Sequence, residues 1–514
     1  MKAARAVRMG WLLRVNRALG PDRSLAVAAR FAAALRACGD GPASPARVSQ
    51  WETGAARVSR CTVRRYERLL GLPEDRLVAV AETLPGTVLD PADRTERTLV
   101  LLDRALGGAS MSGSGWDDLT AALSTHPDVL FHPRDGWERL THRLLAEMVV
   151  ADGSPWLQRN TALTRLLRHP GGGPGTIAAC AAFAGDPAHQ VFMEPLAALH
   201  VTAHPDAYRL VRAQLDHPSS GRALCGALVA AIHKVERHQL APPQVAGLVR
   251  SAAELVADTG VPDEVRHLVP VLLGRLPLGA GGPAVIRLRR LAGADAVGRN
   301  VLDSGRTHAT GTTAAVVSRV TRHAGARVGR ELPEPDRLLP VLVEEMLFDP
   351  DPVTRLSAGF LIAATPYRAP VSAAVAAELP DALRDDDARA AALLAALGAL
   401  GTCPDRTLLE RLVLAPGVRP AVNEAAARAL GLVPGRSPEA FWLLALYRHL
   451  TAWRCTGSAT TLTTVRRLVQ ALGVAGERRI LAALGQDPEV PAAVRSAIGW
   501  WLAVDGTTRV SAAA

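Results

Sequence analysis

The sequence predicts an all-α protein in which a small N-terminal domain of five short helices precedes a long array of packed helices. Hydrophobic residues make up 48% of the chain but aromatic residues only 4%, so the core must consist mainly of Ala, Leu and Val, which favours helices over sheets. From about residue 96 to 505, helical segments alternate with short Pro, Gly and Asp breaks, almost without strand signals. Because 514 residues are too many for one core, we expect two or more domains.

The N-terminal domain is expected to occupy residues 1–84. Apolar residues at helical spacing, interrupted by Gly and Pro, predict its helices over residues 7–19, 24–36, 45 to about 53, 61–70 and 73–84.

The third of these helices has two distinct faces. Ser44 is a favourable N-cap residue, Pro45 suits the first helical position, and Gly54 supplies the stop. Val48 and Trp51 are three residues apart, so they share the face that packs on the domain. The other side is small or polar and is formed by Ala46, Ser49 and Gln50, with Arg47 on its flank. A DNA recognition helix needs such faces, because it must be anchored on its domain and still fit the major groove.

This helix resembles the recognition segment of the lambda-repressor-like helix-turn-helix family, the Cro/C1-type (XRE) regulators. The matching positions are Val48, Ser49, Trp51, Glu52 and Gly54, followed by the segment 66–73. The resemblance covers about 75 of the 514 residues and implies a helix-turn-helix domain that binds double-stranded DNA. The turn over residues 38–43 is longer than the turn of the family.

The resemblance also implies roles for individual residues. Gln50 matches a base-reading glutamine, whose amide can pair with N6 and N7 of adenine, and Ser44 matches the residue that caps the helix beside a phosphate. Trp51 would fill the small core, and Glu52 would bond to local backbone or to an arginine; Val48 and Gly54 complete the structural set. The expected base-reading residues are Pro45, Ala46, Arg47, Ser49 and Gln50.

Basic charge is concentrated in the same part of the chain. Residues 1–90 contain fifteen Lys and Arg against eight Asp and Glu, so they carry +7 of the net charge of +10. The chain has only two lysines among its 59 basic residues, which indicates a GC-rich coding sequence, so only the uneven placement of arginine supports DNA binding. Besides Ser44, the expected phosphate contacts are Arg57, Arg60, Arg64 and Arg65. Some of these arginines could instead form surface pairs with Glu67 or Glu74.

The sequence favours a cytoplasmic protein without a membrane partner. Its six cysteines are scattered and lack paired spacing, which is typical of free thiols in a reducing compartment. Arginines interrupt the apolar residues near the N-terminus, and the longest weakly polar run, 390–401, is too short to cross a membrane.

Several breaks in the later part of the chain resemble one another. The segments 349–353, 416–419 and 487–490 combine Asp or Pro with a following Val, and their starts differ by 67 and 71 residues; the segment 262–266 is a fainter copy. They resemble the inter-helix turn of HEAT-type repeats, with two helical hairpins in each interval. The resemblance implies a HEAT-like α-solenoid after the helix-turn-helix domain.

The expected organisation has six parts. They are a helix-turn-helix domain over 1–84, a linker with connecting helices over 85–125, a helical repeat block over 126–276, an irregular connector over 277–337, a HEAT-like repeat block over 338–505, and a disordered tail over 506–514. The alternative to two blocks is a continuous superhelix with one long loop.

The histidines are clustered, which raises the question of a metal. Eleven of the fourteen lie between residues 126 and 267. Five precede a proline, where a helix is expected to end and its dipole favours histidine: His126, His132, His169, His204 and His217. His200 with His204, or His233 with His238, supplies half a zinc site, but only Glu236 is near as a further ligand. We expect no metal and no cofactor. Since no nucleophile and base can be paired, we expect no enzymatic activity.

These expectations describe a sequence-specific DNA-binding transcriptional regulator. One such domain contacts a half-site, so a homodimer is expected, and the helical repeats would sense a peptide or protein effector. One alternative is an interaction scaffold that does not bind DNA, supported by the long turn and by Pro45 at the groove-facing end. The other is a HEAT-like DNA glycosylase, for which no catalytic acid can be placed.

Overall fold

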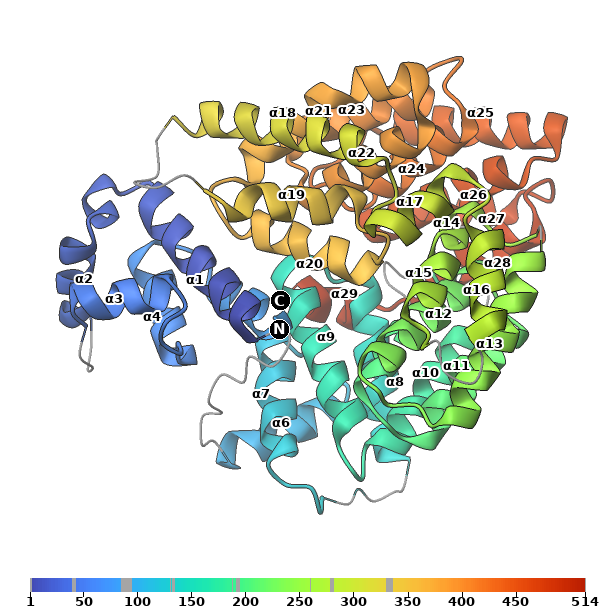
Figure 1. The fold of residues 1–514 in the computed structure, drawn as a ribbon. Helices are drawn as coiled ribbons and strands as arrows, with labels where there is room; N and C mark the ends of the chain where they lie inside the picture. The colour runs from blue at the N-terminus through green and yellow to red at the C-terminus, as the bar shows by residue number, and fades with distance from the viewer. Residues whose placement is uncertain are drawn as a thin grey trace. The chain divides into compact units, whose positions relative to one another are not determined.

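All regular structure in the computed structural model is helical. It describes residues 2–38, 43–84, 95–129, 131, 135–186, 188–190, 195–258, 260–277, 282–329 and 336–513. These ranges contain 29 α-helices and two 3-10 helices and no strand, which confirms the predicted all-α class (Figure 1). The chain divides into two compact units.

The first unit comprises Met1–Ala92, Ala314–Leu347 and Thr354–Val490. It begins with α1 (Lys2–Leu19), the 3-10 helix η1 (Arg23–Ala26), α2 (Ala28–Ala37), α3 (Pro45–Glu52), α4 (Arg60–Leu69) and α5 (Arg76–Thr83). It continues with most of α18 (Thr310–Val328), α19 (Leu338–Phe348) and α20 (Pro352–Ala363), and with α21 (Arg368–Asp385), α22 (Asp387–Leu400), α23 (Cys403–Leu414), α24 (Pro420–Leu430), α25 (Glu439–Thr456), α26 (Ala459–Ala475) and α27 (Arg478–Gln486).

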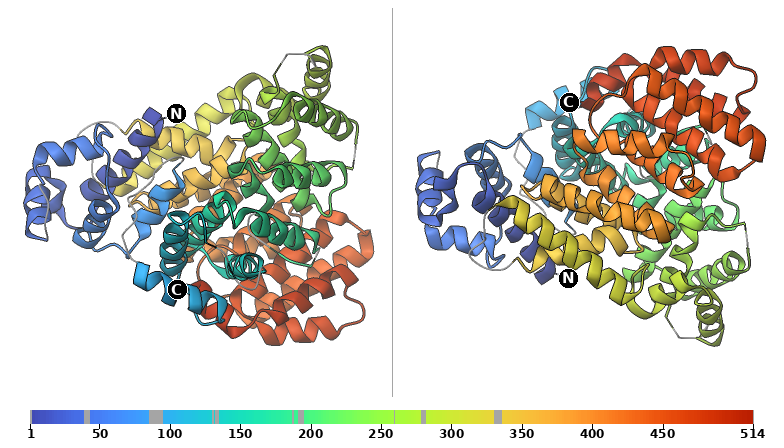
Figure 2. Two further views of the ribbon diagram at one scale, coloured as in Figure 1. Left: turned by 90° about the horizontal axis from the view of Figure 1, so that it is seen from below. Right: turned by 90° about the horizontal axis from the view of Figure 1, so that it is seen from above.

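The later helices of this unit stack as hairpins in two rows, drawn in orange in Figure 2. In one row α22 packs on α24 and α24 on α26, and in the other α21 packs on α23 and α23 on α25; neighbouring helices in the chain join the rows. Ala, Leu and Val supply most of the buried side chains in these helices, as the composition predicts. Small side chains let helix axes approach closely, which suits such a stack.

The second unit comprises Asp93–Thr313, Phe348–Val353 and Pro491–Ala514. Its helices are α6 (Thr95–Leu106), α7 (Gly113–Ser124), α8 (Gly136–Val150), α9 (Gly153–Arg168), α10 (Gly173–Gly185), η2 (Pro195–Val201), α11 (Pro205–Asp216), α12 (Gly221–Glu236), α13 (Pro242–Ala257), α14 (Asp263–Arg266), α15 (Leu268–Arg275), α16 (Gly282–Ala292), α17 (Ala296–Ser304), α28 (Ala492–Ala503) and α29 (Gly506–Ala513).

The breaks predicted at 349–353, 416–419 and 487–490 lie where one helix ends and the next begins. At the first of them the Asp351 carboxylate accepts a hydrogen bond from the Val353 N–H at 3.0 Å, which satisfies a free donor at the start of α20. The polar break at 349–353 therefore caps the helix that follows it, whereas the helices after the other two breaks, α24 and α28, have no side-chain cap.

Two segments expected to be irregular are helical instead. The described part of 277–337 forms α16, α17 and α18, and Val316, Val320 and Ala324 are fully buried along one face of α18. This stripe has helical spacing, but Gly- and Thr-rich sequence around it obscures the pattern. The expected disordered tail forms α29, whose Ser511 and Ala512 are buried.

Other expectations concern residues outside the described ranges. These are the core of the long turn, 39–42, the start of the linker, 85–94, and parts of the expected connector, 278–281 and 330–335. Among the helices that are described, none combines the length and apolarity needed to cross a membrane.

Candidate nucleic-acid interface

Helix α3 is capped at both ends by the residues that the sequence singles out. Ser44 has an extended backbone, with φ −115° and ψ 160°, and its Oγ accepts a hydrogen bond from the Arg47 N–H at 3.1 Å. Pro45 is the first helical residue and needs no partner for a backbone donor. Beyond the helix, Gly54 adopts the left-handed conformation at φ +76°, which suits a helix end.

The inward face of α3 joins an aromatic cluster. Val48 is fully buried and Trp51 is 5% exposed. The ring of Tyr66, from α4, lies with its centroid 4.6 Å from that of Phe31, from α2, and 6.5 Å from that of Trp51. Such aromatic pairs stabilise a core beyond the area that they bury. Helices α2, α3 and α4 therefore share one small core, and Val48 and Trp51 have the expected inward positions.

Glu52 lies at the centre of a buried polar network. Its two carboxylate oxygens accept hydrogen bonds from Nε and Nη2 of Arg17 at 2.6 and 2.7 Å, and the Tyr66 hydroxyl donates a third at 3.2 Å. Arg17 also donates to the carbonyl oxygen of Ala26. Burial lowers the pKa of Arg17, but the hydrogen bond and charge of Glu52 outweigh it and raise that pKa above its ordinary value. Of the two partners that the sequence allows for Glu52, the structure shows the arginine.

The outward face of α3 is open. Every residue of the expected base-reading set is exposed: Pro45, Ala46, Arg47, Ser49 and Gln50. The Arg47 guanidinium donates to Oε1 of Gln50 at 3.2 Å and lies 5.6 Å from the ring centroid of Trp51, a favourable cation–π distance. The face thus presents one guanidinium and one amide side by side, among small side chains.

Two of the expected phosphate contacts are buried inside the N-terminal helices. Arg60 is 8% exposed and its Nη1 lies 3.3 Å from Oε1 of Glu82. Arg65 is also 8% exposed and donates to the carbonyl oxygen of Leu35. A buried guanidinium with internal partners is not presented to a DNA backbone, so we remove both residues from the expected phosphate contacts.

The two remaining arginines differ from each other. Arg64 forms a bidentate pair with Asp75, with Nε–Oδ1 and Nη2–Oδ2 distances of 2.8 and 3.1 Å, whereas Arg57 is exposed. The pairing of these arginines with Glu67 or Glu74 that the sequence left open is not what the structure shows. Of the four predicted arginines, Arg57 is the exposed one, and Ser44, the fifth member of the predicted set, is exposed as well.

Glu67, on α4, caps the start of α5. Its carboxylate accepts hydrogen bonds from the backbone N–H groups of Asp75 at 3.0 Å, of Val78 at 3.1 Å and of Leu77. Burial raises the pKa of Glu67 to about 7, although these N–H groups act in the opposite direction. The side chain thus satisfies free donors of α5 from the neighbouring helix α4.

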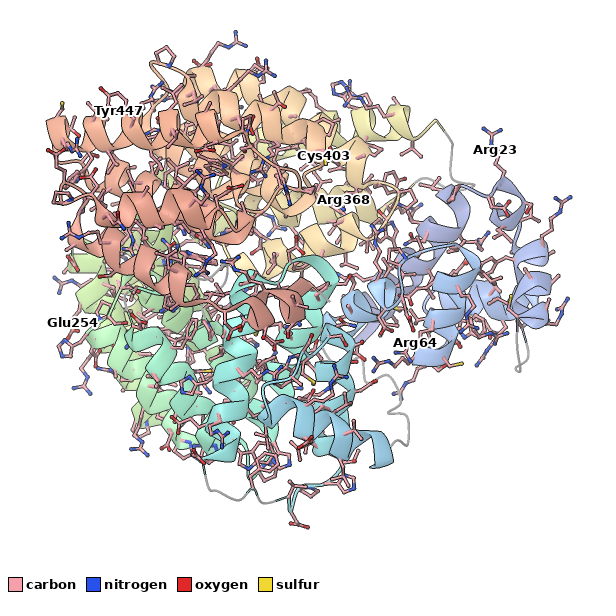
Figure 3. The ribbon with its side chains drawn as sticks, turned by 180° about the vertical axis from the view of Figure 1, so that it is seen from behind. Arg23, Arg64, Glu254, Arg368, Cys403 and Tyr447 are labelled. Atoms are coloured by element: carbon pink, nitrogen blue, oxygen red, sulfur yellow. The ribbon has the colours of Figure 1, made fainter. Side chains whose placement is uncertain are left out.

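The exposed surface of the N-terminal helices is basic, partly through residues that sequence reasoning missed. Among the described side chains of residues 6–84, the exposed acidic ones are Asp22 and Glu74. The exposed basic ones are Arg23, Arg30, Arg36, Arg47, Arg57 and Arg68. Figure 3 labels Arg23, which extends outward from η1, and the paired Arg64 on α4. The missed arginines lie outside the buried apolar stripes of their helices, so a search by helical face could have found them.

Helix α1 attaches the N-terminal helices to the hairpins of the first unit. Trp11 is 2% exposed, and its Nε1 donates to both carboxylate oxygens of Asp336 at 2.9 and 3.0 Å. Its ring is nearly parallel to that of Tyr367 at 6.4 Å between centroids. Nearby, Arg8 and Glu345 form an ion pair at 2.6 Å. The sequence did not predict this attachment, because its partners lie more than 300 residues apart.

Three of the four histidines considered as zinc ligands, His200, His204 and His233, make other contacts. Nδ1 and Nε2 of His233 lie 3.0 and 3.1 Å from carboxylate oxygens of Glu236 and Asp351. Although burial lowers the pKa of His233, these hydrogen bonds raise it to about 9. His204 caps α11 by accepting a hydrogen bond from the Asp206 N–H at 3.2 Å. Within the described residues, no group of three or more His, Cys, Asp and Glu side chains is placed to hold a metal ion.

The fold and this surface define an all-α protein with a basic five-helix N-terminal part attached to stacked helical hairpins. Comparison with known proteins finds no family model that matches the chain and no curated protein that is significantly similar to it.

The Arg17–Glu52 pair provides a first test. We expect Glu52→Ala to destabilise the N-terminal helices by about 3 to 5 kcal/mol, because it leaves the buried Arg17 charge unpaired. Hydrogen exchange of the backbone amides of α1, α3 and α4 in the full chain measures the effect. The matched control is Glu74→Ala at an exposed site, which should change protection by about 0.5 kcal/mol or less. Equal protection in the two variants would contradict the central role of Glu52.

Gly54 provides a second test. A Cβ atom there would lie 2.5 Å from the carbonyl carbon of Ala6, whereas at Gly71, with φ +63°, it would meet nothing within 4 Å. Gly54→Ala should therefore combine a steric clash with the cost of a left-handed residue, and Gly71→Ala should show only the latter, about 1 kcal/mol. Thermal unfolding of the full-length variants compares them, and an equal loss of stability would disprove the close approach.

Proposed function

We propose that the protein is a sequence-specific DNA-binding transcriptional regulator and that α3 is its recognition helix. The observation that carries the proposal is the division of α3 into a fully inward Val48–Trp51 face and an exposed face formed by Ala46, Arg47, Ser49 and Gln50. A helix held in this way can enter the major groove with its anchoring side chains behind it.

The surrounding charge supports the same proposal. Among its described side chains, the N-terminal part exposes six arginines and only two acidic residues. A positive surface of this kind attracts phosphates, and the attraction depends on the salt concentration. The finer fold that we propose is a helix-turn-helix domain followed by a HEAT-like α-solenoid. The order of five short helices supports the first part, and the two rows of stacked hairpins support the second.

Substitutions on the exposed face test DNA recognition. On a site selected from a random DNA library, Gln50→Ala should weaken binding by about 1 to 3 kcal/mol and relax the preference at one base pair. Arg57→Ala should weaken binding to all sequences alike and reduce the salt slope by about one. Fluorescence anisotropy across a salt series measures both effects.

The matched control is Arg60→Ala, which removes a buried arginine of the same region. It should lower the thermal stability of the protein and leave the salt slope of the folded fraction unchanged. If Gln50→Ala behaved identically on selected and random DNA, Gln50 would not be a base reader. If Arg60→Ala and Arg57→Ala reduced the salt slope equally, the phosphate contacts would be misassigned.

An interaction scaffold is a second candidate function. It is favoured by the internal partners of Arg60, Arg64 and Arg65, which withdraw three expected phosphate contacts from the surface. Electrophoretic shift assays with the selected site and with random DNA separate the candidates. Absence of any salt-sensitive binding by the folded, full-length chain would favour the scaffold.

We further propose that the regulator acts as a homodimer through the exposed face of α25. One recognition helix reads one half-site, so stable binding calls for two copies. On α25, the side chains of Leu443, Leu444 and Tyr447 are 53%, 54% and 70% exposed. Neighbouring apolar side chains exposed to this extent mark an interaction surface.

The same face combines an exposed aromatic side chain with a hollow. Tyr447, labelled on α25 in Figure 3, is 70% exposed and helps to line a hollow of about 440 Å³ together with residues that include Leu414, Leu444 and Thr451. In a twofold arrangement, the tyrosine of one copy would fill the hollow of the other, and the reverse contact would follow by symmetry. A second copy of the chain is therefore the occupant that we assign to this face.

The double variant Leu444→Glu/Tyr447→Glu tests the interface. It should convert a dimer into a monomer, because burying four added carboxylates in a twofold contact is strongly unfavourable. Light scattering after gel filtration measures the mass. Leu99→Glu, at another exposed leucine (69% exposed), should leave the dimer intact. A wild-type monomer, or a double variant that stays dimeric, would contradict the assignment.

A further inference from the structure

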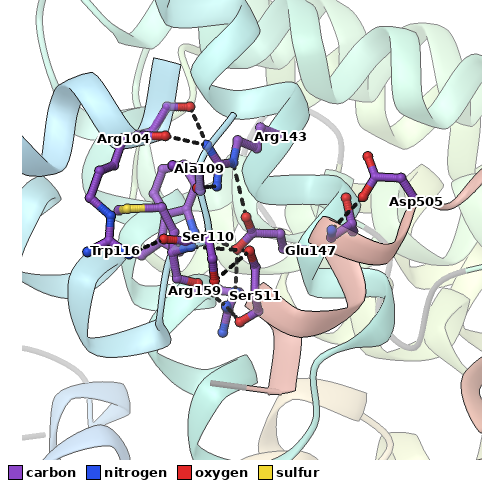
Figure 4. Close-up of polar contacts among 12 residues, drawn as sticks. Arg104, Ala109, Ser110, Trp116, Arg143, Glu147, Arg159, Asp505 and Ser511 are labelled. Atoms are coloured by element: carbon purple, nitrogen blue, oxygen red, sulfur yellow. Dashed lines mark hydrogen bonds and ion pairs between the residues drawn. The ribbon is translucent and has the colours of Figure 1, made fainter. Parts of the chain in front are cut away.

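The C-terminal helix α29 lies against a buried polar network in the second unit. Glu147 and Arg159 are 1% and 0% exposed. The carboxylate of Glu147 accepts hydrogen bonds from Nε1 of Trp116 at 2.7 Å, from Nε of Arg159 at 3.1 Å and from Nε of Arg143 at 3.1 Å (Figure 4). This network joins α7, α8 and α9 without any help from the C-terminal helix.

Arg159 and its neighbour Met111 also donate hydrogen bonds to the C-terminal helix. Nη2 of Arg159 donates to the carbonyl oxygens of Met111, at 3.0 Å, and of Ser511. The Met111 N–H donates to the Ser511 Oγ at 3.1 Å. A buried guanidinium and a buried backbone donor thus both take acceptors from one residue of α29, whose side chain is itself fully buried.

Apart from Ser511, the described contacts of the tail include Arg509, whose guanidinium lies 5.8 Å from the ring centroid of Trp501, and Thr508, whose N–H donates to the Asp505 carboxylate. Helix α29 has eight residues, GTTRVSAA, a length at which an isolated helix is unstable in water. Among the side chains of α29 whose burial is described, Ser511 and Ala512 are fully buried, whereas Val510 is 63% exposed. A short segment held by few buried side chains opens readily. The surface beneath α29, by contrast, is built from the longer helices α8 and α9 and their satisfied charge network.

We propose that the surface covered by α29, formed by α8, α9 and the segment before α7 that contains Met111, is a peptide-binding site and that the tail is its intramolecular ligand. The site recognises a main-chain carbonyl through Arg159, a hydroxyl side chain through the Met111 N–H, and a small following residue in the place of Ala512. A partner peptide with a Ser or Thr followed by Ala displaces the tail. This inference stands independently of DNA binding, since it concerns the second unit alone.

The test uses a variant that ends at Asp505 and a fluorescent peptide of residues 506–513 blocked at both ends. Anisotropy should show micromolar binding to the truncated chain and at least tenfold weaker binding to the full chain, whose own tail competes. Circular dichroism and thermal unfolding establish that the truncated chain is folded. The assay contains no DNA, so its outcome does not depend on the proposed function.

Matched peptides identify the contacts. A peptide with Ser511→Ala, which removes only the hydroxyl and so cannot accept the Met111 N–H, should bind about fivefold more weakly. A peptide with Val510→Ala, altered at the exposed position, should bind like the original. Equal binding of all three peptides, or no binding to the folded truncated chain, would overturn the proposal.

A second protein variant decides the matter if the truncated chain does not fold. Full-length Ser511→Ala keeps α29 but removes its hydrogen bond to Met111, so it should bind the original peptide several times more tightly than the wild-type chain does. If this folded variant and the wild-type chain bind the peptide equally, α29 is a fixed structural element and the proposal is wrong.

Discussion

The N-terminal part of the protein depends on one buried ion pair, between Arg17 of α1 and Glu52 of α3. The carboxylate also receives the hydroxyl of Tyr66, and the guanidinium also reaches the carbonyl of Ala26. A buried pair of this kind adds little net stability over a well-packed apolar contact, but it is costly to break. Its value here is positional, because it joins α1, η1, α3 and α4 at defined atoms. The direction in which α3 presents Gln50 follows from it.

The sequence predicts α3 well because the signals for that helix are local. Ser44, Pro45 and Gly54 act through backbone geometry within a few residues, and the spacing of Val48 and Trp51 identifies the buried face. The predicted limits of the other helices are less accurate. In place of the expected helix over 24–36, the structure has the 3-10 helix η1 followed by α2, which begins at Ala28. Whether the exposed face of α3 contacts DNA is a question that neither spacing nor capping answers.

The arginines show why the other parts of the candidate site could not be predicted from the sequence. Arg60, Arg64 and Arg65 follow α3 at positions where the sequence suggests exposure, but their partners come from α5, from the turn before it and from the end of α2. Such pairings depend on the angles and positions at which helices pack against one another. Residue spacing within a short stretch of sequence does not reveal them. Helix α29 could not be predicted for the same reason. Its small and polar residues are typical of a disordered segment, and the contact of Ser511 with Arg159 that holds the helix comes from a distant part of the chain.

The attachment of α1 through Trp11, Asp336 and Tyr367 has a consequence for the geometry of any operator. In the proposed dimer, α3 and the α25 contact belong to the same compact unit, and the contacts of Trp11 with Asp336 and Tyr367 would tie the helices around α3 to the hairpins that carry the dimer contact. The angular phase between two half-sites would then be set by the protein. Inserting half a helical turn of DNA between them, about five base pairs, would place the second half-site on the opposite side of the duplex. A regulator built on a flexible tether could follow that rotation, whereas one built in this way would have to twist the DNA.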